Sequence, residues 1–351
     1  MDTARDWRGG QSQIFLTASG LLARGHAVAL ACQAGGALEQ RAKAAGLDVF
    51  VLRFRGDLAP AAAIGLRRAV RRFRPDVLQL NDPHAVGTGL VAAVGSGVAQ
   101  VVTRRVDFHL RGRASLWKYS VADRVIAVSQ AIAGILANDG LDGGRLRLVY
   151  EGVPDRSPQP GGAAVLTELG VPAGAPVIGN VAALTNHKDH ATLLSAMPRV
   201  LERVPEARLV VAGEGKLRPE LERQAAQLGI GDRCLFLGFR SDLDRLIPAF
   251  SVFCLSSRWE GLGTSLLDAM AFSRPIVATA AGGIPEAVVD GVTGRVVPVQ
   301  DPDALADALV LLLTRSDLRE AMGRAGRERF LTRFTSERMV DETLRVFGEV
   351  V

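Results

Sequence analysis

The stretch of sequence that decides the fold is SSRWEGLGTSLLDAMAFSRPIVATAAGGIPE, which occupies residues 256–286. An apolar run at 252–255 precedes it and predicts a buried strand that ends where the stretch begins. A loop carrying Glu260 follows, and a turn of small residues then opens a helix expected at 265–272. The turn consists of Gly261, Leu262, Gly263, Thr264 and Ser265. Strand, loop and helix in this order are the repeating unit of an α/β protein.

The turn at 261–265 has the properties of an anion-binding site. The first N–H groups of a helix have no partners within the helix, and the helix dipole adds partial positive charge there. Glycines let the backbone approach a bound group closely, so we expect this turn to hold a diphosphate. Asp268 follows in the first helical turns, where its carboxylate can reach a group beside the bound phosphates.

Outward from this stretch, apolar β-branched runs alternate with amphipathic segments of helix length along nearly the whole chain. The strands expected in the first half are 27–31, 48–52, 77–80, 100–103, 124–128 and 147–150. Those expected in the second half are 176–181, 207–212, 234–237, 252–255, 275–278 and 294–297. Helices are expected at 10–24, 60–74, 130–139, 189–203, 217–228, 265–272, 303–314, 317–329 and 336–350. Two such series predict two parallel sheets with helices on both faces.

A segment rich in proline and glycine, residues 151–162, separates the two series and is interpreted as a linker. We therefore expect a Rossmann-like domain at 1–152, a second at 163–334, and a terminal helix at 335–351 that packs back on the first domain. Ligands of such sheets bind beyond the carboxyl ends of the strands. The natural site of this α/β architecture is the cleft between the two facing domains.

The start of the chain lacks one expected element, because no apolar strand precedes the glycine pair Gly9 and Gly10. In a doubly wound sheet the first strand is central. The strands at 27–31 and 77–80 should therefore face a gap with unpaired backbone groups. We expect the native start to lie about 6–10 residues upstream, enough for one short strand.

The quoted stretch resembles glycosyltransferase family 4, the retaining enzymes of GT-B type. The family's signature places two acids eight residues apart in the setting EGxG…EAMAxGxPVVA…GGxPE, and the matching acids here are Glu260 and Asp268. The resemblance implies that Glu260 contacts hydroxyl groups of the donor sugar and Asp268 those of the ribose. The family usually has glutamate at the second position, so Asp268 has one methylene less of reach.

A second motif, VIGNVAALTNHKDHATLL at 177–194, resembles the family's opening strand and loop, GxVGRLxxxKGxxxL. In the family an arginine and a lysine of this motif grip the donor diphosphate. Lys188 matches the lysine, whereas Ala183 stands at the arginine position. His187 or Asn186 can substitute in part. One charge-assisted contact to phosphate typically contributes about 1.5–3 kcal/mol. The alternative reading of Lys188 is a solvated lysine near a helix start.

Two further segments match the family less specifically. Gly9 and Gly10 resemble its glycine-rich loop beneath the donor phosphates. Gly238, Phe239 and Arg240 follow an expected strand and resemble the loop that lies against the nucleotide base. All five are expected to bind the donor, together with Gly261, Gly263, Thr264, Ser265, Asp268 and His187.

Polar residues follow two expected strands of the first domain. Many relatives carry a catalytic histidine after the strand matching 100–103, but here Arg105 stands at that position and His109 follows four residues later. Arg104 and His84 are expected on the acceptor side. The catalytic candidates that the resemblance implies are Glu260, Lys188, His109 and Arg105.

Composition restricts the environment of the protein. No apolar run approaches the roughly 18–20 residues of a membrane-spanning helix, and the first residues contain no signal-peptide core. The three widely spaced cysteines are interpreted as structural thiols, which fits the cytoplasm. Asp242 and Asp244 follow a serine and are interpreted as a helix cap rather than a metal site. No metal and no other cofactor are expected. The absence of GxGxxG after a strand counts against a nicotinamide enzyme.

The net charge of +5 is unevenly distributed. Residues 1–152 hold 20 Lys and Arg against 12 Asp and Glu, a balance of +8, and the rest hold 22 against 25, a balance of −3. A basic first half favours an anionic partner, such as the inner face of the cytoplasmic membrane or an acidic acceptor. Solvated faces of arginine-rich helices are the alternative. The expected contacts are Arg67, Arg68, Arg71, Arg72 and Arg74. No nucleic-acid partner is expected.

The resemblance implies a glycosyltransferase that moves a sugar from a nucleotide-diphosphate sugar to a glycan or lipid-linked acceptor with retention of anomeric configuration. In such enzymes the leaving diphosphate is thought to take the acceptor's proton, so the protein supplies positioning and charge stabilisation. Two alternatives stay open. Ala183, Asp268 and the absent histidine favour a non-catalytic binding subunit of the same fold, which would turn over no nucleotide sugar. A nucleotide-sugar epimerase would release the donor's epimer without any acceptor.

Overall fold

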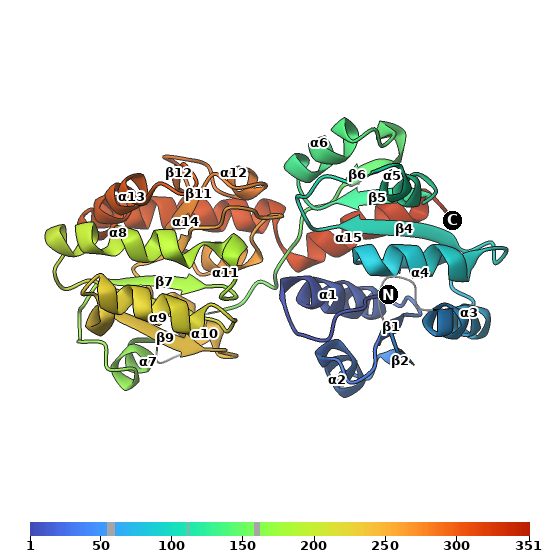
Figure 1. Ribbon diagram of the computed structural model, residues 1–351, viewed down its shortest axis with the longest axis horizontal. Coiled ribbons are helices and arrows are strands. Elements are labelled where there is room, and N and C mark those ends of the chain that lie inside the picture. Colours follow the sequence, from blue (N-terminus) through green and yellow to red (C-terminus); the bar gives the residue numbers. More distant parts are fainter. Residues whose placement is uncertain (55–59, 111, 158–161) are drawn as a thin grey trace. The chain divides into compact units, whose positions relative to one another are not determined.

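The computed structural model describes residues 1–54, 60–110, 112–157 and 162–351. The chain divides into two compact units, labelled in Figure 1 by their helices and strands. Unit 1 comprises Met1–Val153 and Thr335–Val351, and unit 2 comprises Pro154–Phe334. Part of the expected linker, residues 158–161, lies outside the described residues.

Unit 1 alternates strands and helices along the chain. Its strands are β1 (Ala29–Gln33), β2 (Asp48–Leu52), β3 (Val77–Leu80), β4 (Ala99–Arg104), β5 (Arg124–Ala127) and β6 (Leu146–Leu148). Its helices are α1 (Gly9–Ala23), α2 (Ala37–Ala44), α3 (Pro60–Phe73), α4 (Pro83–Ala93), α5 (Gly112–Ser120), α6 (Gln130–Asn138) and α15 (Ser336–Gly348).

The strands of unit 1 form parallel pairs, β1 with β2 and, in order, β3-β4-β5-β6. Residues at the start of the chain lie between the two groups. The Asp2 amide donates to the Ala31 carbonyl of β1 at 3.0 Å, and the Asn81 amide, just after β3, donates to the Met1 carbonyl at 3.1 Å. The Met1 amino group donates to the Gln79 carbonyl at 2.7 Å. The gap predicted beside β1 and β3 is thus occupied by Met1 and Asp2, and the expectation that these strands have unpaired groups there was wrong.

Alternation along the central strands of unit 1 divides its core between the two faces. Val102 and Val125 pack with apolar residues of α3, α4 and α6, whereas Val101 and Ile126 pack with residues of α1 and α15. This follows from the two-residue period of a strand, which turns neighbouring side chains to opposite faces. The terminal helix α15 packs on α1, where Val340 lies directly against Gly20.

Unit 2 repeats the alternation. Its strands are β7 (Val177–Val181), β8 (Arg208–Ala212), β9 (Cys234–Gly238), β10 (Val252–Leu255), β11 (Ile276–Thr279) and β12 (Gly294–Val297). Its α-helices are α7 (Gly162–Glu168), α8 (His190–Arg203), α9 (Arg218–Gln227), α10 (Leu243–Leu246), α11 (Thr264–Ala271), α12 (Ile284–Ala287), α13 (Pro302–Thr314) and α14 (Ser316–Arg333).

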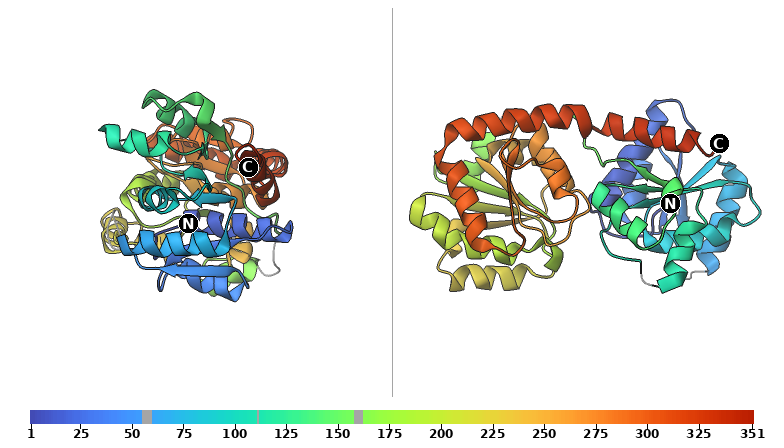
Figure 2. Two further views of the ribbon diagram at one scale, coloured as in Figure 1. Left: turned by 90° about the vertical axis from the view of Figure 1, so that its right-hand side faces the viewer. Right: turned by 90° about the horizontal axis from the view of Figure 1, so that it is seen from above.

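The sheet of unit 2 is parallel, with strand order β12-β11-β10-β7-β8-β9. The chain builds outward from β7 to one edge and then returns to the other side of β7 with β10. This is the doubly wound Rossmann order, and its topological switch point lies between β7 and β10. Helices cover both faces of the sheet (Figure 2), with α8 in contact with both α9 and α13, and with α11 against α14.

The expected elements agree closely with the structure. Each expected strand is present within two residues of its predicted bounds, as is each expected helix apart from the later end of α14. Helices α2, α4, α5, α7 and α12 were not predicted, whereas the helix start expected at Asp242 agrees with α10. Helix α4 is buried over most of its surface and therefore shows no amphipathic period, and α12 is only one turn long.

Candidate functional site

The candidate site of unit 2 lies at the carboxyl ends of β7 and β10, on either side of the switch point. The loop after β7 carries Lys188, and the loop after β10 carries Glu260. The Lys188 ammonium donates a hydrogen bond to Glu260 Oε2, and the Ser257 hydroxyl donates to the same oxygen at 3.2 Å. Both charged side chains are largely shielded from solvent, with 17% and 13% of their surfaces exposed. The structure therefore brings together two residues that lie 72 positions apart in the sequence.

A second ion pair, between Arg258 and Asp189, connects the same two loops. The Arg258 guanidinium contacts both carboxylate oxygens of Asp189, at 2.9 and 3.1 Å. Asp189 is buried, and the Thr192 hydroxyl donates to it at 2.8 Å. The Arg258 amide donates to the His187 carbonyl at 2.8 Å, and the Ser256 hydroxyl donates to the Asp189 carbonyl at 2.9 Å. These contacts fix the backbone on either side of Lys188 to the backbone that precedes Glu260.

Deeper in unit 2, side chains connect the strands themselves. The Asn180 side-chain amide of β7 donates to the Cys254 carbonyl of β10 at 2.9 Å, and Asn180 Oδ1 lies 3.0 Å from His190 Nε2. His190 is buried, and desolvation lowers its pKa to about 4, with the nearby Lys188 charge acting in the same direction. His190 is therefore neutral at physiological pH, and its Nε2 donates to Asn180. Asn180 thus connects β7 to β10 at the switch point, and His190 holds the Asn180 side chain in place.

The turn predicted as an anion site opens a helix as expected. Helix α11 begins at Thr264, and Gly263 precedes it with φ +88°, a left-handed conformation that favours glycine. Gly261 and Gly263 are buried, and Thr264 and Ser265 form the first helical positions. The helix N-terminus thus follows directly from the loop that holds Glu260.

Asp268 lies one turn further along α11. Desolvation raises the pKa of its carboxyl to about 6, although Arg156 partly opposes this shift, and part of its surface stays open to solvent. No hydrogen bond to the Asp268 carboxylate occurs among the described residues. This carboxylate is therefore open to a ligand, and its charge depends on pH within the physiological range.

The loop Gly213-Glu-Gly-Lys216 after β8 was not predicted as part of the site. The backbone of this loop touches the loop that leads to Lys188, since a Cβ on Gly213 would lie 1.9 Å from the Ala182 carbonyl oxygen and one on Gly215 would lie 2.2 Å from that of Leu184. The signal was present, because a Gly-x-Gly directly after a buried strand is typical of close backbone approach at the ligand edge of such sheets.

The predicted base-binding segment ends β9. Gly238 has φ +72°, and its carbonyl accepts from the Gly213 amide at 2.8 Å, so the loops after β8 and β9 touch. Phe239 is exposed. Arg240 contacts Asp242 at 2.6 Å, and this hydrogen bond is the main cause that lowers the Asp242 pKa. Asp242 stands at the N-cap position of α10, as expected, but its side chain accepts no capping hydrogen bond from the first turn of that helix. His187, another predicted donor contact, lies 3.2 Å from the Thr185 hydroxyl.

In unit 1, Arg105 follows β4 at the carboxyl edge of the sheet. Its guanidinium pairs with Glu151 at 3.0 Å and donates to Asn81 Oδ1 at 2.9 Å. Gly10, in the first turn of α1, lies over the Arg105 side chain, since a Cβ there would be 3.9 Å from Arg105 Cδ. Gly9 begins the same helix. The structure therefore places Gly9, Gly10 and Arg105 close together in unit 1.

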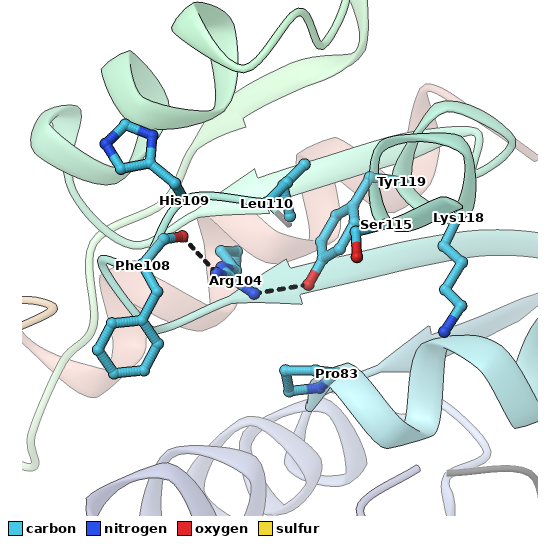
Figure 3. Close-up of a pocket in the computed structure, with 8 residues that line it drawn as sticks. All are labelled: Pro83, Arg104, Phe108, His109, Leu110, Ser115, Lys118 and Tyr119. Atoms are coloured by element: carbon cyan, nitrogen blue, oxygen red, sulfur yellow. Dashed lines mark hydrogen bonds between the residues drawn. The ribbon is translucent and has the colours of Figure 1, made fainter. Parts of the chain in front are cut away.

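Two of the other predicted residues of unit 1, Arg104 and His109, line a pocket of about 260 Å³ beside α4 and α5 (Figure 3). Arg104 lines the pocket, but its guanidinium is hydrogen-bonded within the protein. It donates to the Tyr119 hydroxyl at 2.9 Å and to the Phe108 carbonyl at 2.6 Å. His109 also lines it, with 70% of its side chain exposed and Nδ1 2.7 Å from Asp139. His84 is exposed in the first turn of α4. Lys118 and Ser115, from α5, were not predicted.

Within the described residues, no three His, Cys, Asp or Glu side chains gather closely enough to hold a metal ion. None of the helices in that part of the chain is both long and apolar enough to cross a membrane. The three cysteines are buried and free of disulfides.

Two family models match the chain, one in each half. Residues 7–156 match "Glycosyltransferase Family 4", and residues 166–329 match "Glycosyl transferases group 1". A GDP-mannose-dependent α-(1-6)-phosphatidylinositol monomannoside mannosyltransferase of Mycolicibacterium smegmatis is 31% identical over 287 residues, 78% of this chain and 69% of that protein. N-acetyl-α-D-glucosaminyl L-malate synthase of Bacillus anthracis is 31% identical over 159 residues, 45% of this chain and 42% of that protein. The chain thus spans less than half the length of some curated relatives.

Solved structures extend the likeness to the whole chain. HepE of Anabaena, crystallised with UDP and glucose, aligns with a TM-score of 0.88 at 20% identity over 99% of this chain and 100% of that one. A glycosyltransferase of Rickettsia africae aligns with a TM-score of 0.88 at 18% identity over 99% and 97%. These matches confirm the expected GT-B fold of two Rossmann-like domains.

Proposed function

The chain belongs to glycosyltransferase family 4, and on that premise we propose that it transfers a sugar from a nucleotide-diphosphate sugar to a glycan or lipid-linked acceptor. We further propose that the anomeric configuration is retained and that no metal or other cofactor takes part. The Lys188–Glu260 pair at the switch point of unit 2 is the observation that supports this most directly.

The donor is proposed to bind along the carboxyl edge of the unit 2 sheet. Lys188 and the N-terminus of α11 are positioned to balance the charge of a diphosphate, since the helix terminus offers free N–H groups as well as partial positive charge. Glu260 can accept hydrogen bonds from sugar hydroxyls, and Asp268 from ribose hydroxyls. The loops that carry Gly213 and Gly238 would lie beside the nucleoside. The comparisons agree with this proposal, because HepE was crystallised with UDP-glucose.

The proposed chemistry needs no catalytic base. The acceptor oxygen bonds to the anomeric carbon on the face from which the diphosphate departs, and the leaving phosphate oxygen takes the acceptor's proton. The protein then contributes positioning and stabilisation of the departing charge, as Lys188 and the α11 terminus can do. Arg105 adds a fixed positive charge in unit 1, held by Glu151 and Asn81.

The acceptor is proposed to bind at the pocket beside α4 and α5. Phe108 and Leu110 provide apolar walls, and Lys118 makes no hydrogen bond or ion pair among the described residues. Ser115→Phe fills this pocket and is expected to abolish transfer while nucleotide-sugar affinity stays unchanged. Equal loss of donor affinity would place the acceptor elsewhere.

The face of unit 1 formed by α3, α4 and α5 is proposed to contact an anionic membrane. Helix α3 exposes Arg68, Arg71 and Arg72 on one side, and α5 exposes Trp117 over 61% of its surface. Arg67 donates to the Val94 carbonyl at 2.8 Å and so connects α3 to the exposed apolar end of α4. Exposed cations and exposed tryptophans are both typical of peripheral membrane surfaces.

Turnover of a panel of UDP-, GDP- and ADP-sugars with candidate acceptors tests the proposed function. Release of the nucleoside diphosphate in step with a new glycoside supports it. Release of a donor epimer without acceptor would indicate the epimerase instead. Binding of nucleotide sugars with no turnover in the panel would favour a binding subunit.

A further inference from the structure

The charges of Lys188 and Glu260 neutralise each other in the free protein. The Lys188 ammonium donates to Glu260, and it has no other hydrogen-bond partner in the described part of the chain. Both side chains are more than four-fifths shielded from solvent. A charge left alone in such surroundings is unfavourable, because neither water nor a counterion compensates it fully.

Under the proposed function, the two charged side chains contact different parts of the donor. Lys188 binds the diphosphate, and Glu260 accepts hydrogen bonds from the sugar hydroxyls. An intact nucleotide sugar therefore supplies a new partner to both halves of the pair. A nucleoside diphosphate supplies one to Lys188 alone, and it leaves charged phosphate groups beside a carboxylate that has lost its cation without gaining the sugar hydroxyls.

We propose that the Lys188–Glu260 pair is a product-release device. When the bond between the anomeric carbon and the β-phosphate oxygen breaks, the sugar moves to the acceptor oxygen and the acceptor's proton moves to the leaving diphosphate. Glu260 then loses the hydroxyl groups that had replaced Lys188. It competes with the remaining nucleoside diphosphate for Lys188, and the pair re-forms as the product leaves.

The surrounding contacts suit this role because they hold both backbones in place. Arg258 and Asp189 tie the Lys188 loop to the Glu260 loop, and the Gly283 amide donates to the Glu260 carbonyl at 3.2 Å. The two loops are already fixed in the arrangement that lets the side chains meet. Re-forming the pair thus requires movement of side chains only, whereas a pair on two loose loops would have to order the backbone as well.

Titration calorimetry of the full chain tests the inference, with UDP, GDP and ADP as probes, each also as its glucose or mannose derivative. Glu260→Gln is expected to bind the nucleoside diphosphate about tenfold more tightly than the parent, a change of about 1.4 kcal/mol. The intact nucleotide sugar should gain less, because the neutral amide of the variant hydrogen-bonds its hydroxyls more weakly than the carboxylate does. Glu320→Gln is the matched control: it removes one carboxylate from an ion pair on the exposed side of α14, and its affinities should equal those of the parent.

A double-mutant cycle separates this effect from a general change in charge. In a Lys188→Met background, Glu260→Gln should no longer tighten diphosphate binding beyond the control. Melting temperatures of each variant report folding, and Glu260→Ala serves in place of the glutamine variant if that one unfolds. Unchanged or weaker diphosphate binding in both Glu260 variants overturns the inference while the proposed function stands. Failure of the parent to bind any of the probes overturns both.

Discussion

In the proposed donor site, Lys188 is the cation on which diphosphate binding is expected to depend, because Ala183 stands where the family has an arginine. Lys188→Ala is expected to weaken nucleotide-sugar binding about tenfold. Removal of a lysine without an ion-pair partner would weaken binding more. In the parent, the donor must first break the ion pair between Lys188 and Glu260, and in the variant this cost is absent. The ligand-induced rise in melting temperature measures the effect. Lys43→Ala, which removes the cation of an exposed pair with Glu39, should leave that rise unchanged.

Asp268 predicts a pH dependence. Its pKa of about 6 lies above the ordinary value of 3.8, so its carboxylate becomes charged only as the pH rises through about 6. If ribose hydroxyls donate to that carboxylate, nucleotide-sugar affinity should rise between pH 5 and pH 7. Asp268→Asn should flatten the rise. Phosphate groups of a nucleotide sugar do not titrate in this range, so a rise that persists in the variant would exclude Asp268 from the donor site.

The same shift has a consequence for folding. Between about pH 4 and pH 6 the folded protein retains a proton on Asp268 that the unfolded chain has lost. The contribution of Asp268 to stability therefore falls as pH rises through this window and stays constant above it. Chemical denaturation of the parent and of Asp268→Asn at pH 4 and pH 7 measures the difference, which should favour the variant at the higher pH.

At the scale of elements, the two loops at the switch point act as one structure because Arg258 binds Asp189. Arg258→Met leaves a buried carboxylate without its cation, and we expect a loss of about 1–2 kcal/mol in the free energy of unfolding. We also expect a clear fall in kcat/KM, since Lys188 and Glu260 lose their fixed spacing. Arg258→Lys restores the charge but not the two-point contact, so it should recover stability better than activity. Equal recovery of both would make Arg258 a purely structural residue.

Helices α3 to α5 carry the membrane prediction. The full chain should sediment with vesicles that contain anionic phosphatidylglycerol at low salt and be released at about 0.5 M salt, where screening removes the attraction. Arg68→Glu with Arg72→Glu should abolish sedimentation. The matched control, Arg223→Glu with Arg324→Glu, reverses two exposed arginines of unit 2 and should sediment like the parent. Equal sedimentation with uncharged phosphatidylcholine vesicles would favour the solvated-face interpretation.

The positions of the strands could be predicted from the sequence more readily than the contacts between their side chains. Hydrophobic periodicity and turn residues indicated where the strands lie, because β7 to β11 are nearly continuous apolar runs between glycine-rich loops. These sequence patterns could not show that Lys188 and Glu260 are in contact, since this contact depends on β10 returning to lie beside β7. The ion pairs of Arg240 with Asp242 and of His109 with Asp139 could not be predicted either. The rotamer of each side chain depends on the neighbours that the folded chain places around it. The order of strands in unit 2 is what turns the two separate motifs into one site.

At the scale of the whole molecule, both units are built on parallel strands with polar residues at the carboxyl ends of those strands, but the charges of these residues differ. Unit 2 offers a cation and two carboxylates at that edge, which suits a sugar nucleotide. Unit 1 offers the buried Arg105–Glu151 pair and a pocket with apolar walls and a lysine. A transferase needs two such chemically distinct sites, one for a charged donor and one for an amphiphilic acceptor, whereas an epimerase needs only the first.

The central claim is that this chain transfers a sugar with retention and without a metal. Proton NMR of the full chain with a nucleotide sugar and its acceptor, in the presence of EDTA, tests this most directly. We expect the anomeric signal of the donor to be replaced by a glycoside signal of the same configuration, in step with release of the nucleoside diphosphate. A glycoside of inverted configuration, or a reaction that stops in EDTA and resumes on addition of a divalent cation, would contradict it.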